Sequence, residues 1–246
     1  METTYIEIDS PDKHLSDVLE EIPSNVILYK TLTGIGATYS EIKAQRHSII
    51  IEPNVPVIIG KCNSDKHKND NLLGVYEGVT TDRIIKYLGA SRGKYYKILT
   101  TPESFTKVED AFLIFNGKIY NTCFLLIDEA HKTIKDVDYR SDIVLPMNDF
   151  FKFKGKALVS ATPLKFSDPR FEENGFSIIK IEPTYDYAKE IDIKPSTNIL
   201  REVWEEFGWM PFITGQDKDR PFFIFINSVG IIYSIISQLK LFDKSS

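Results

Sequence analysis

Cysteine is scarce in this sequence, and basic residues are in deficit. Cys62 and Cys123 are the only two cysteines among 246 residues, too few for a disulfide framework. Residues 1–4 lack the basic and apolar regions of a secretory signal. Thirty Lys and Arg face 35 Asp and Glu, so bulk positive charge will not attract nucleic acid. We expect a cytoplasmic protein in which any polyanion binds at a local patch.

Long uncharged runs are also rare. Residues 222–239 form one that is long enough to be considered as a membrane span. It begins with the strand-like Phe222-Phe223-Ile224-Phe225-Ile226, continues with the turn signal Asn227-Ser228, and then shows apolar residues at helical spacing. A buried strand followed by an amphipathic helix explains this pattern better than a membrane span. We therefore expect no membrane association.

Short apolar runs alternate with segments of helical pattern along the first two thirds of the chain. Strands are predicted over residues 26–29, 48–51, 72–76, 97–100, 124–127, 157–160 and 176–181, and helices over 38–46, 81–88 and 102–115. This alternation is typical of an α/β fold with a parallel sheet, and the continuously apolar strands require helices on both faces.

Composition changes near residue 183, which suggests a domain boundary. We predict a first domain over residues 1–182, a linker over 183–197 with two prolines and several acidic residues, and a second α/β lobe over 198–246. About 50 residues are few for such a lobe, so it is either minimal or incomplete.

A pair of carboxylates follows one buried strand directly. In Leu125-Leu126-Ile127-Asp128-Glu129-Ala130-His131 the strand delivers both to its carboxyl end, where parallel sheets bind ligands. An aspartate there can hold Mg²⁺, and the next glutamate can orient or deprotonate a water that attacks a phosphate. The alternative is an acidic helix start, which the helix dipole also favours.

A glycine-bearing loop precedes this pair by roughly 95 residues. Thr33-Gly34-Ile35-Gly36-Ala37-Thr38 lies between a predicted strand and a predicted helix. Glycines let backbone N–H groups wrap a phosphate, and a threonine after the loop can ligate Mg²⁺. The alternative is an ordinary turn with two glycines.

Two more polar segments end predicted strands. Thr101-Pro102-Glu103 follows one strand and caps a helix, and Ser160-Ala161-Thr162 ends another. Each alone is most simply a capped turn, but all four segments occur in a consistent order.

With these four segments in order, the chain resembles the superfamily-two helicases, the nucleic-acid-dependent ATPases of the DEAD/DEAH-box class. The match covers most of the first 165 residues, and Asp128–His131 is a DEAH box. Residues 223–228 look like the first strand of the family's second RecA-like lobe. The resemblance implies a RecA-like fold, ATP and Mg²⁺ as cofactors, and single-stranded or duplex DNA or RNA as partner.

The resemblance also implies a role for each matched residue. Asp128 and Thr38 would hold Mg²⁺, Glu129 would be the general base, and Gly34, Ile35, Gly36, Ala37 and Thr38 would bind the nucleotide. His131, Ser160 and Thr162 would couple nucleotide state to lobe movement. Pro53, Thr101, Pro102 and Glu103 would lie along the nucleic acid.

Ala37 departs from the family pattern, which has lysine at this place. That lysine contacts the β- and γ-phosphates, so its loss predicts weaker nucleotide binding and slow hydrolysis. A natural loss and a deliberate substitution both account for the alanine. Lys30, at the end of the preceding strand, is one replacement from another direction, and Lys43 is a weaker one. The family's late arginine motifs are also missing.

Residues 60–107 carry a local excess of positive charge, with nine Lys or Arg against five Asp or Glu. Tyr76, Tyr87, Tyr95 and Tyr96 are interleaved with them and could stack on bases. Alternatively, residues 61–71 form a solvated loop and the tyrosines belong to the core.

The leading hypothesis is therefore a superfamily-two helicase-like protein that binds nucleotide and nucleic acid, with hydrolysis impaired or absent. The alternative is a pseudoenzyme, a helicase-like scaffold or nucleic-acid-binding module of a larger complex. An incomplete second lobe would expose apolar surface, so we also predict self-association or a protein partner.

Overall fold

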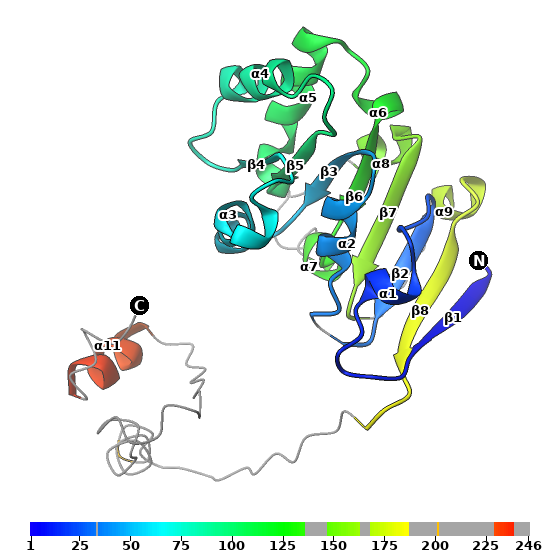
Figure 1. Ribbon diagram of the computed structural model, residues 1–246, viewed down its shortest axis with the longest axis vertical. Coiled ribbons are helices and arrows are strands. Elements are labelled where there is room, and N and C mark those ends of the chain that lie inside the picture. Colours follow the sequence, from blue (N-terminus) through cyan, green and yellow to red (C-terminus); the bar gives the residue numbers. More distant parts are fainter. Residues whose placement is uncertain (33, 136–146, 163–167, 187–200, 202–228, 239–246) are drawn as a thin grey trace. The chain divides into compact units, whose positions relative to one another are not determined.

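The computed structural model describes residues 1–32, 34–135, 147–162, 168–186, 201 and 229–238 (Figure 1). The chain divides into two compact units, Met1–Tyr187 and Ala188–Ser246. The predicted boundary at residue 182 falls at the end of the last described strand of the first unit. Most of the predicted linker, from residue 187 onward, lies outside the described residues.

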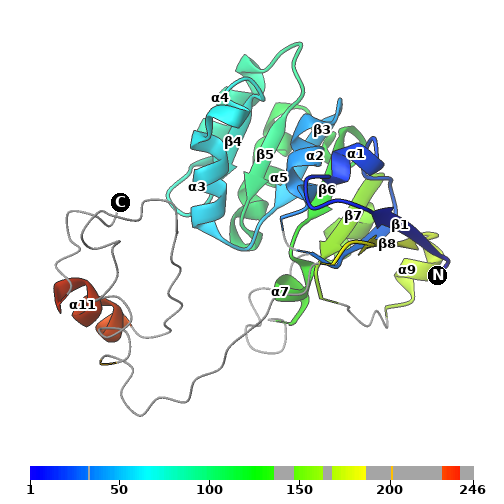
Figure 2. The same cartoon turned by 60° about the horizontal axis from the view of Figure 1, so that its bottom comes forward.

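The first unit is built on one sheet of eight strands. They are β1 (Thr3–Ile8), β2 (Val26–Lys30), β3 (His47–Ile51), β4 (Leu72–Val75), β5 (Lys97–Thr100), β6 (Cys123–Ile127), β7 (Gly155–Ser160) and β8 (Ser177–Pro183). Their order is β1-β8-β2-β7-β6-β3-β5-β4 and every neighbouring pair is parallel. In both views β1 and β4 lie at opposite edges (Figures 1 and 2). The predicted α/β fold is confirmed.

Helices cover both faces of this sheet. They are α1 (Leu15–Val18), α2 (Ala37–Lys43), α3 (Val55–Asn63), α4 (Thr81–Ala90), α5 (Phe105–Phe115), α6 (Ile119–Thr122), α7 (Ala130–Lys135), α8 (Met147–Lys152) and α9 (Arg170–Glu173), with 3₁₀ turns at Asp65–His67 and Pro102–Ser104. The prediction of one helix over residues 102–115 thus resolves into a 3₁₀ turn followed by α5.

Two apolar clusters form because successive strand residues point to opposite faces. Ile27 packs in the cluster that α4, α5 and α8 cover, whereas Leu28 packs with α1, α2 and α3. At about 25 cal/mol per Å² of buried apolar surface, these two layers supply most of the stabilisation of the unit.

Helix α2 ends three residues earlier than predicted. The buried ammonium of Lys97 donates to the backbone carbonyls of Glu41 and Ala44, at 2.7 and 2.8 Å. A cation there satisfies carbonyls that have no partner inside the helix. The end of α2 is therefore fixed by a residue of β5 that no local pattern reveals.

Within the second unit, the structure describes Arg201 and α11 (Val229–Gln238). The helix predicted after the Asn227-Ser228 turn is confirmed over these ten residues. The predicted strand over residues 222–226 lies outside the described part of the chain. Among the described residues, no helix is both long and apolar enough to cross a membrane.

Parallel strands bring their carboxyl ends to one edge of the sheet. The register pairs Tyr29 of β2 with Ser160 of β7, Ile127 of β6 with Leu158 of β7, and Ile51 of β3 with Ile127 of β6. The residues that follow these positions therefore meet, although they are up to 130 positions apart in sequence. Four of the predicted functional segments begin at this edge.

Candidate functional site

The glycine-bearing loop and the strand ends enclose a cavity of about 330 Å³. Its lining residues come from β2, the loop and α2, the end of β3, α3, and the segment after β6: Lys30, Gly34, Gly36, Ala37, Thr38, Tyr39, Glu52, Asn54, Val57, Lys61, Asp128, Glu129 and Lys132. Four of the five predicted loop residues thus line one cavity with both predicted carboxylates.

The conformation of the loop depends on glycine at two positions. Gly34 and Gly36 have φ of 80° and 85°, in the left-handed region that side chains with a Cβ rarely occupy. Helix α2 begins directly after Gly36. The side chain of Ile35 packs in the core, and its backbone carbonyl accepts a hydrogen bond of 2.8 Å from Leu15 N–H, so the predicted nucleotide contact of Ile35 is one for its backbone N–H.

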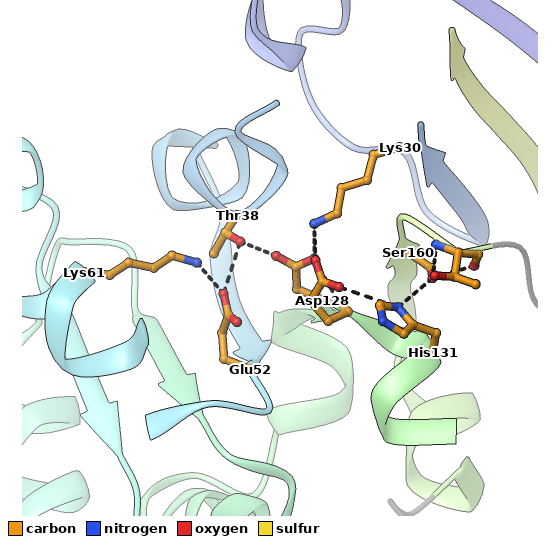
Figure 3. Close-up of polar contacts among 9 residues, drawn as sticks. Lys30, Thr38, Glu52, Lys61, Asp128, His131 and Ser160 are labelled. Atoms are coloured by element: carbon orange, nitrogen blue, oxygen red, sulfur yellow. Dashed lines mark hydrogen bonds and ion pairs between the residues drawn. The ribbon is translucent and has the colours of Figure 1, made fainter. Parts of the chain in front are cut away.

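Thr38 and Asp128 are in contact inside the cavity. The threonine hydroxyl donates to Oδ2 of Asp128, and both residues are buried (Figure 3). The same hydroxyl lies 3.2 Å from Oε1 of Glu52, which follows β3. Three oxygen-bearing side chains from three elements therefore converge on one point.

These oxygens suit a hard cation. Among the described residues, no group of three His, Cys, Asp or Glu side chains is arranged to hold a metal on its own. A Mg²⁺ ion takes few protein ligands and completes its shell with water and phosphate oxygens. The Thr38 hydroxyl and the Asp128 carboxylate fit that donor set.

Glu52 was not identified as a site residue from the sequence. Its carboxylate is ion-paired with Lys61, and burial together with the negative charge of Asp128 raises its pKa. The signal that pointed to Asp128, a carboxylate directly after an apolar parallel strand, also applied to Glu52.

Lys30 is the central cation of the site. Its Nζ lies 2.9 Å from Oδ1 of Asp128 and 2.8 Å from Oε1 of Glu129, and the residue is 6% exposed. Burial alone would lower the pKa of Lys30, but the two carboxylates reverse this and raise it. Burial likewise opposes ionisation of Asp128, and Lys30 and Thr38 outweigh it, so the pKa of Asp128 is lowered. Both directions describe a charged pair.

Glu129 has a backbone conformation that is unusual for its residue type. Its φ is 50°, and its N–H donates to Oδ1 of Asp128 at 2.8 Å. Left-handed non-glycine residues cost free energy and concentrate at functional sites. This turn places the two consecutive carboxylates on the same side, where Lys30 contacts both.

The side chains of His131 and Ser160 are in contact, an arrangement that their predicted joint role requires. Nδ1 of His131 lies 3.1 Å from Oγ of Ser160 and 3.5 Å from Oε2 of Glu129 (Figure 3). Thr162 joins through its backbone, because Ser160 Oγ donates to its carbonyl at 2.7 Å and accepts from its N–H at 3.2 Å.

The four residues predicted to contact nucleic acid lie at the ends of β3 and β5. Pro53 and Pro102 are partly buried, and Glu103 is exposed. Thr101 is 4% exposed, and its N–H donates to Val75 O at 3.2 Å. Its side chain is therefore not accessible in this structure, which limits the predicted contact surface to the other three.

The basic, tyrosine-rich segment of residues 60–107 divides between the core and the surface. Lys97 is buried and Lys61 is ion-paired with Glu52, whereas six basic residues are exposed: Lys66, Lys68, Arg83, Lys86, Arg92 and Lys94. Tyr76, Tyr87 and Tyr96 pack against the core clusters, and of the four tyrosines Tyr95 is the exposed one. The alternative in which the tyrosines belong to the core therefore holds for Tyr76, Tyr87 and Tyr96.

No family model and no curated protein matches this sequence, so the similar proteins are found by their structures. Among the similar solved structures is the DUF1998 helicase MrfA, with 13% identity over 90% of this chain and 36% of that one, and a TM-score of 0.53. Another is Mss116p bound to single-stranded RNA and AMP-PNP, with 13% identity over 89% and 56% and a TM-score of 0.50. The fold of this chain is similar to that of these two helicases.

A hypothetical ATP-dependent RNA helicase from Sulfolobus tokodaii is also similar, with 16% identity over 64% of this chain and 48% of that one, and a TM-score of 0.44. The chain spans about half or less of the length of these three structures. At these identities the likeness is one of fold, and the helicase-like fold predicted from the four segments is confirmed.

Proposed function

We propose that this chain binds a Mg²⁺-nucleoside triphosphate, ATP first among them, as part of a nucleic-acid-dependent machine of the superfamily-two type. One observation carries the proposal. The buried hydroxyl of Thr38 contacts Asp128 on the wall of a cavity whose floor is a glycine loop. A purely structural turn does not require a hydroxyl, two carboxylates and two left-handed glycines at one sheet edge.

Each residue has a chemical task in this proposal. The backbone around Gly34 and Gly36 gives N–H groups to the phosphates, and Thr38 and Asp128 hold the metal. The Mg²⁺ ion, when bound, offsets phosphate charge. Glu129, which is 22% exposed at its side chain and faces the same cavity, accepts a proton from water.

We expect hydrolysis by this chain to be slow. Ala37 is buried and supplies no cation where the family has lysine. Oε1 of Glu129 is also paired with Lys30, so that oxygen is not free to accept a proton in this state. Removing one charge-stabilising group at a phosphoryl-transfer site costs several orders of magnitude in rate.

Nucleic acid is the partner we propose for the edge formed by the ends of β3 and β5. Mss116p carries single-stranded RNA in its structure, and the fold is shared. Pro53, Pro102 and exposed Glu103 lie at that edge. The proposal covers DNA and RNA alike.

A non-enzymatic scaffold is the alternative function, and one observation favours it. The same Lys30 ammonium engages both carboxylates that the metal and the water would need. If that pair were permanent, the cavity would be closed to Mg²⁺ and the domain would act through its surfaces.

Calorimetric titration of Mg²⁺-ATP and Mg²⁺-ADP tests the proposal. We expect binding that is lost in EDTA and weakened at least about tenfold in Asp128→Asn and Thr38→Ala, since each removes a metal ligand. Asp70→Asn is the matched carboxylate control, because Asp70 pairs with Lys43 outside the cavity. Absence of binding at millimolar nucleotide would overturn the proposal and favour the scaffold.

Fluorescence anisotropy with labelled single-stranded RNA and DNA tests the second partner. We expect binding that changes with nucleotide state. Identical curves with ATP, ADP and no nucleotide would contradict a coupled machine.

A further inference from the structure

We infer that Lys30 replaces the missing loop lysine as the residue that binds the terminal phosphate. This inference rests on the proposed nucleotide site and deepens it. In the family, the positive charge comes from a lysine at the start of the helix, the position of Ala37 here. In this chain, Lys30 at the end of β2 would supply it.

Three carboxylates line the cavity, and they would repel the phosphates of a nucleotide unless a positive charge offsets them. Its lining contains three lysines. Lys61 is ion-paired with Glu52, and Lys132 is exposed. Lys30 alone among the three is both buried and directed at the carboxylate pair (Figure 3).

Burying the ammonium of Lys30 costs free energy, and a residue with only a packing role would not need that charge. It is the last residue of β2, paired in register with Ile181 of β8, and an apolar side chain would satisfy the burial there. Two charged partners offset the desolvation of the Lys30 ammonium. They are Asp128 and Glu129, the residues proposed to hold the metal and to accept a proton from water.

Donor counting leaves room for a phosphate oxygen. An ammonium has three N–H donors, and the contacts with Asp128 and Glu129 use two. Asp128 also contacts Thr38, so the ammonium lies one carboxylate away from the proposed metal position. A phosphate that shares the metal with Thr38 would therefore come within reach of the flexible four-carbon stem.

Charge balance explains why the ion pair need not be permanent. Asp128 and Thr38 would hold the metal, and its charge would then neutralise that carboxylate and weaken the attraction of Asp128 for the Lys30 ammonium. The phosphate is then the anion that Lys30 can pair with. In the absence of nucleotide the lysine pairs with buried Asp128 and with partly exposed Glu129, and in its presence it changes partner.

Titration of Mg²⁺-ATP and Mg²⁺-ADP into the wild type, Lys30→Gln and Lys43→Gln tests this. Glutamine keeps an N–H donor for Asp128 but removes the charge. We expect a loss of about ten- to hundredfold in ATP affinity for Lys30→Gln, with a smaller loss for ADP, since a charged hydrogen bond to the terminal phosphate disappears. Lys43, paired with Asp70 at 2.7 Å, is the matched lysine, and its variant should bind like the wild type.

Ala37→Lys gives a second test in which Lys30 stays in place. If the site already has its cation, we expect the added lysine to raise ATP affinity less than about threefold. We also expect Ala37→Lys to recover binding when combined with Lys30→Gln. The affinity of Ala37→Lys by itself can be measured whether or not Lys30→Gln folds.

The outcomes separate this inference from the proposed function. Unchanged or tighter ATP binding in folded Lys30→Gln, or a gain of more than tenfold in Ala37→Lys alone, would make Lys30 a counter-ion that blocks the site and overturn the inference. The nucleotide site itself would stand in either case. A wild type that binds no nucleotide would overturn both.

Discussion

Nδ1 of His131 lies 3.1 Å from the hydroxyl oxygen of Ser160, and this contact joins the start of α7 to the end of β7. The serine proton is used by the carbonyl of Thr162, at 2.7 Å. The serine oxygen is therefore placed to accept a hydrogen bond from the imidazole in the tautomer that carries a proton on Nδ1. His131, the last residue of the Asp128–His131 segment, is thus in contact with the last residue of β7.

A double-mutant cycle of His131→Ala and Ser160→Ala measures this bond. We expect a coupling of about 0.5 to 1.5 kcal/mol in the free energy of unfolding, the net worth of a partly buried hydrogen bond. Urea denaturation of the four proteins provides the values. As a control, the changes in unfolding free energy for Ser160→Ala and Thr122→Ala should be additive, because Thr122 precedes β6 whereas His131 follows it. Additive changes for His131→Ala and Ser160→Ala would contradict the contact.

Lys97 predicts a pH dependence of stability above neutrality. Burial lowers its pKa to about 8, whereas the unfolded side chain keeps its ordinary value near 10.5. Between these values the unfolded state binds the extra proton, so stability rises with pH. The contribution should grow by roughly 1 to 2 kcal/mol from pH 7.5 to 9.5.

The variant Lys97→Met isolates that contribution. Its stability should lack the rise, and the difference between wild type and variant should shift in favour of the wild type as the pH increases. Denaturation at several pH values checks this. Parallel pH profiles for the two proteins would contradict a lowered pKa.

Glu41 is fully buried and accepts three polar contacts. They come from Nη2 and Nε of Arg46, at 2.5 and 2.9 Å, and from Oγ of Ser48, at 2.5 Å. Glu41→Ala leaves these donors without their acceptor, so we expect a loss of about 3 kcal/mol or more in unfolding free energy. Lys43→Ala, which breaks a more exposed pair, should cost less than about 1 kcal/mol. Similar losses would contradict the distinction.

Gly74 and Gly89 should respond to alanine in opposite directions. A Cβ at Gly74 would lie 2.8 Å from Cγ2 of Ile58 and 3.2 Å from Sγ of Cys62, whereas a Cβ at Gly89 meets nothing within 4 Å. Gly74→Ala should therefore destabilise by about 1 to 3 kcal/mol, because β4 and α3 must separate. Gly89→Ala, in α4, should stabilise by up to about 1 kcal/mol. Thermal denaturation distinguishes them.

Most of the sheet could be predicted because its inner strands are continuously apolar and bounded by polar residues. Strand β1 was missed since Thr3–Ile8 is mostly exposed, at an edge, and its partner residues in β8 lie 175 positions away. The Asp128–His131 segment and the glycine loop were found because local order carries their signal. Their contact with each other depends on the register of three strands, β2, β7 and β6.

The residues that the sequence did not place are those whose role depends on distant partners. Lys30 was the stronger of two candidate replacements, because Lys43 lies further along the following helix. What the sequence does not show is the partner of Lys30, Asp128, which is 98 positions later and lies 2.9 Å from its Nζ. Glu52 and Lys97 were likewise visible only as the end and the beginning of strands.

The pairing of β1 with β8 has a consequence for synthesis. Every described ladder contact of Thr3–Ile8 is with residues 178–183, so during synthesis β1 has no sheet partner until β8 has been made. Six strands, β2 to β7, can assemble in the meantime, and β8 presents its free edge when it docks. Strand β1 is therefore the last strand of this sheet to pair, and a protease acting during synthesis can reach it before it does.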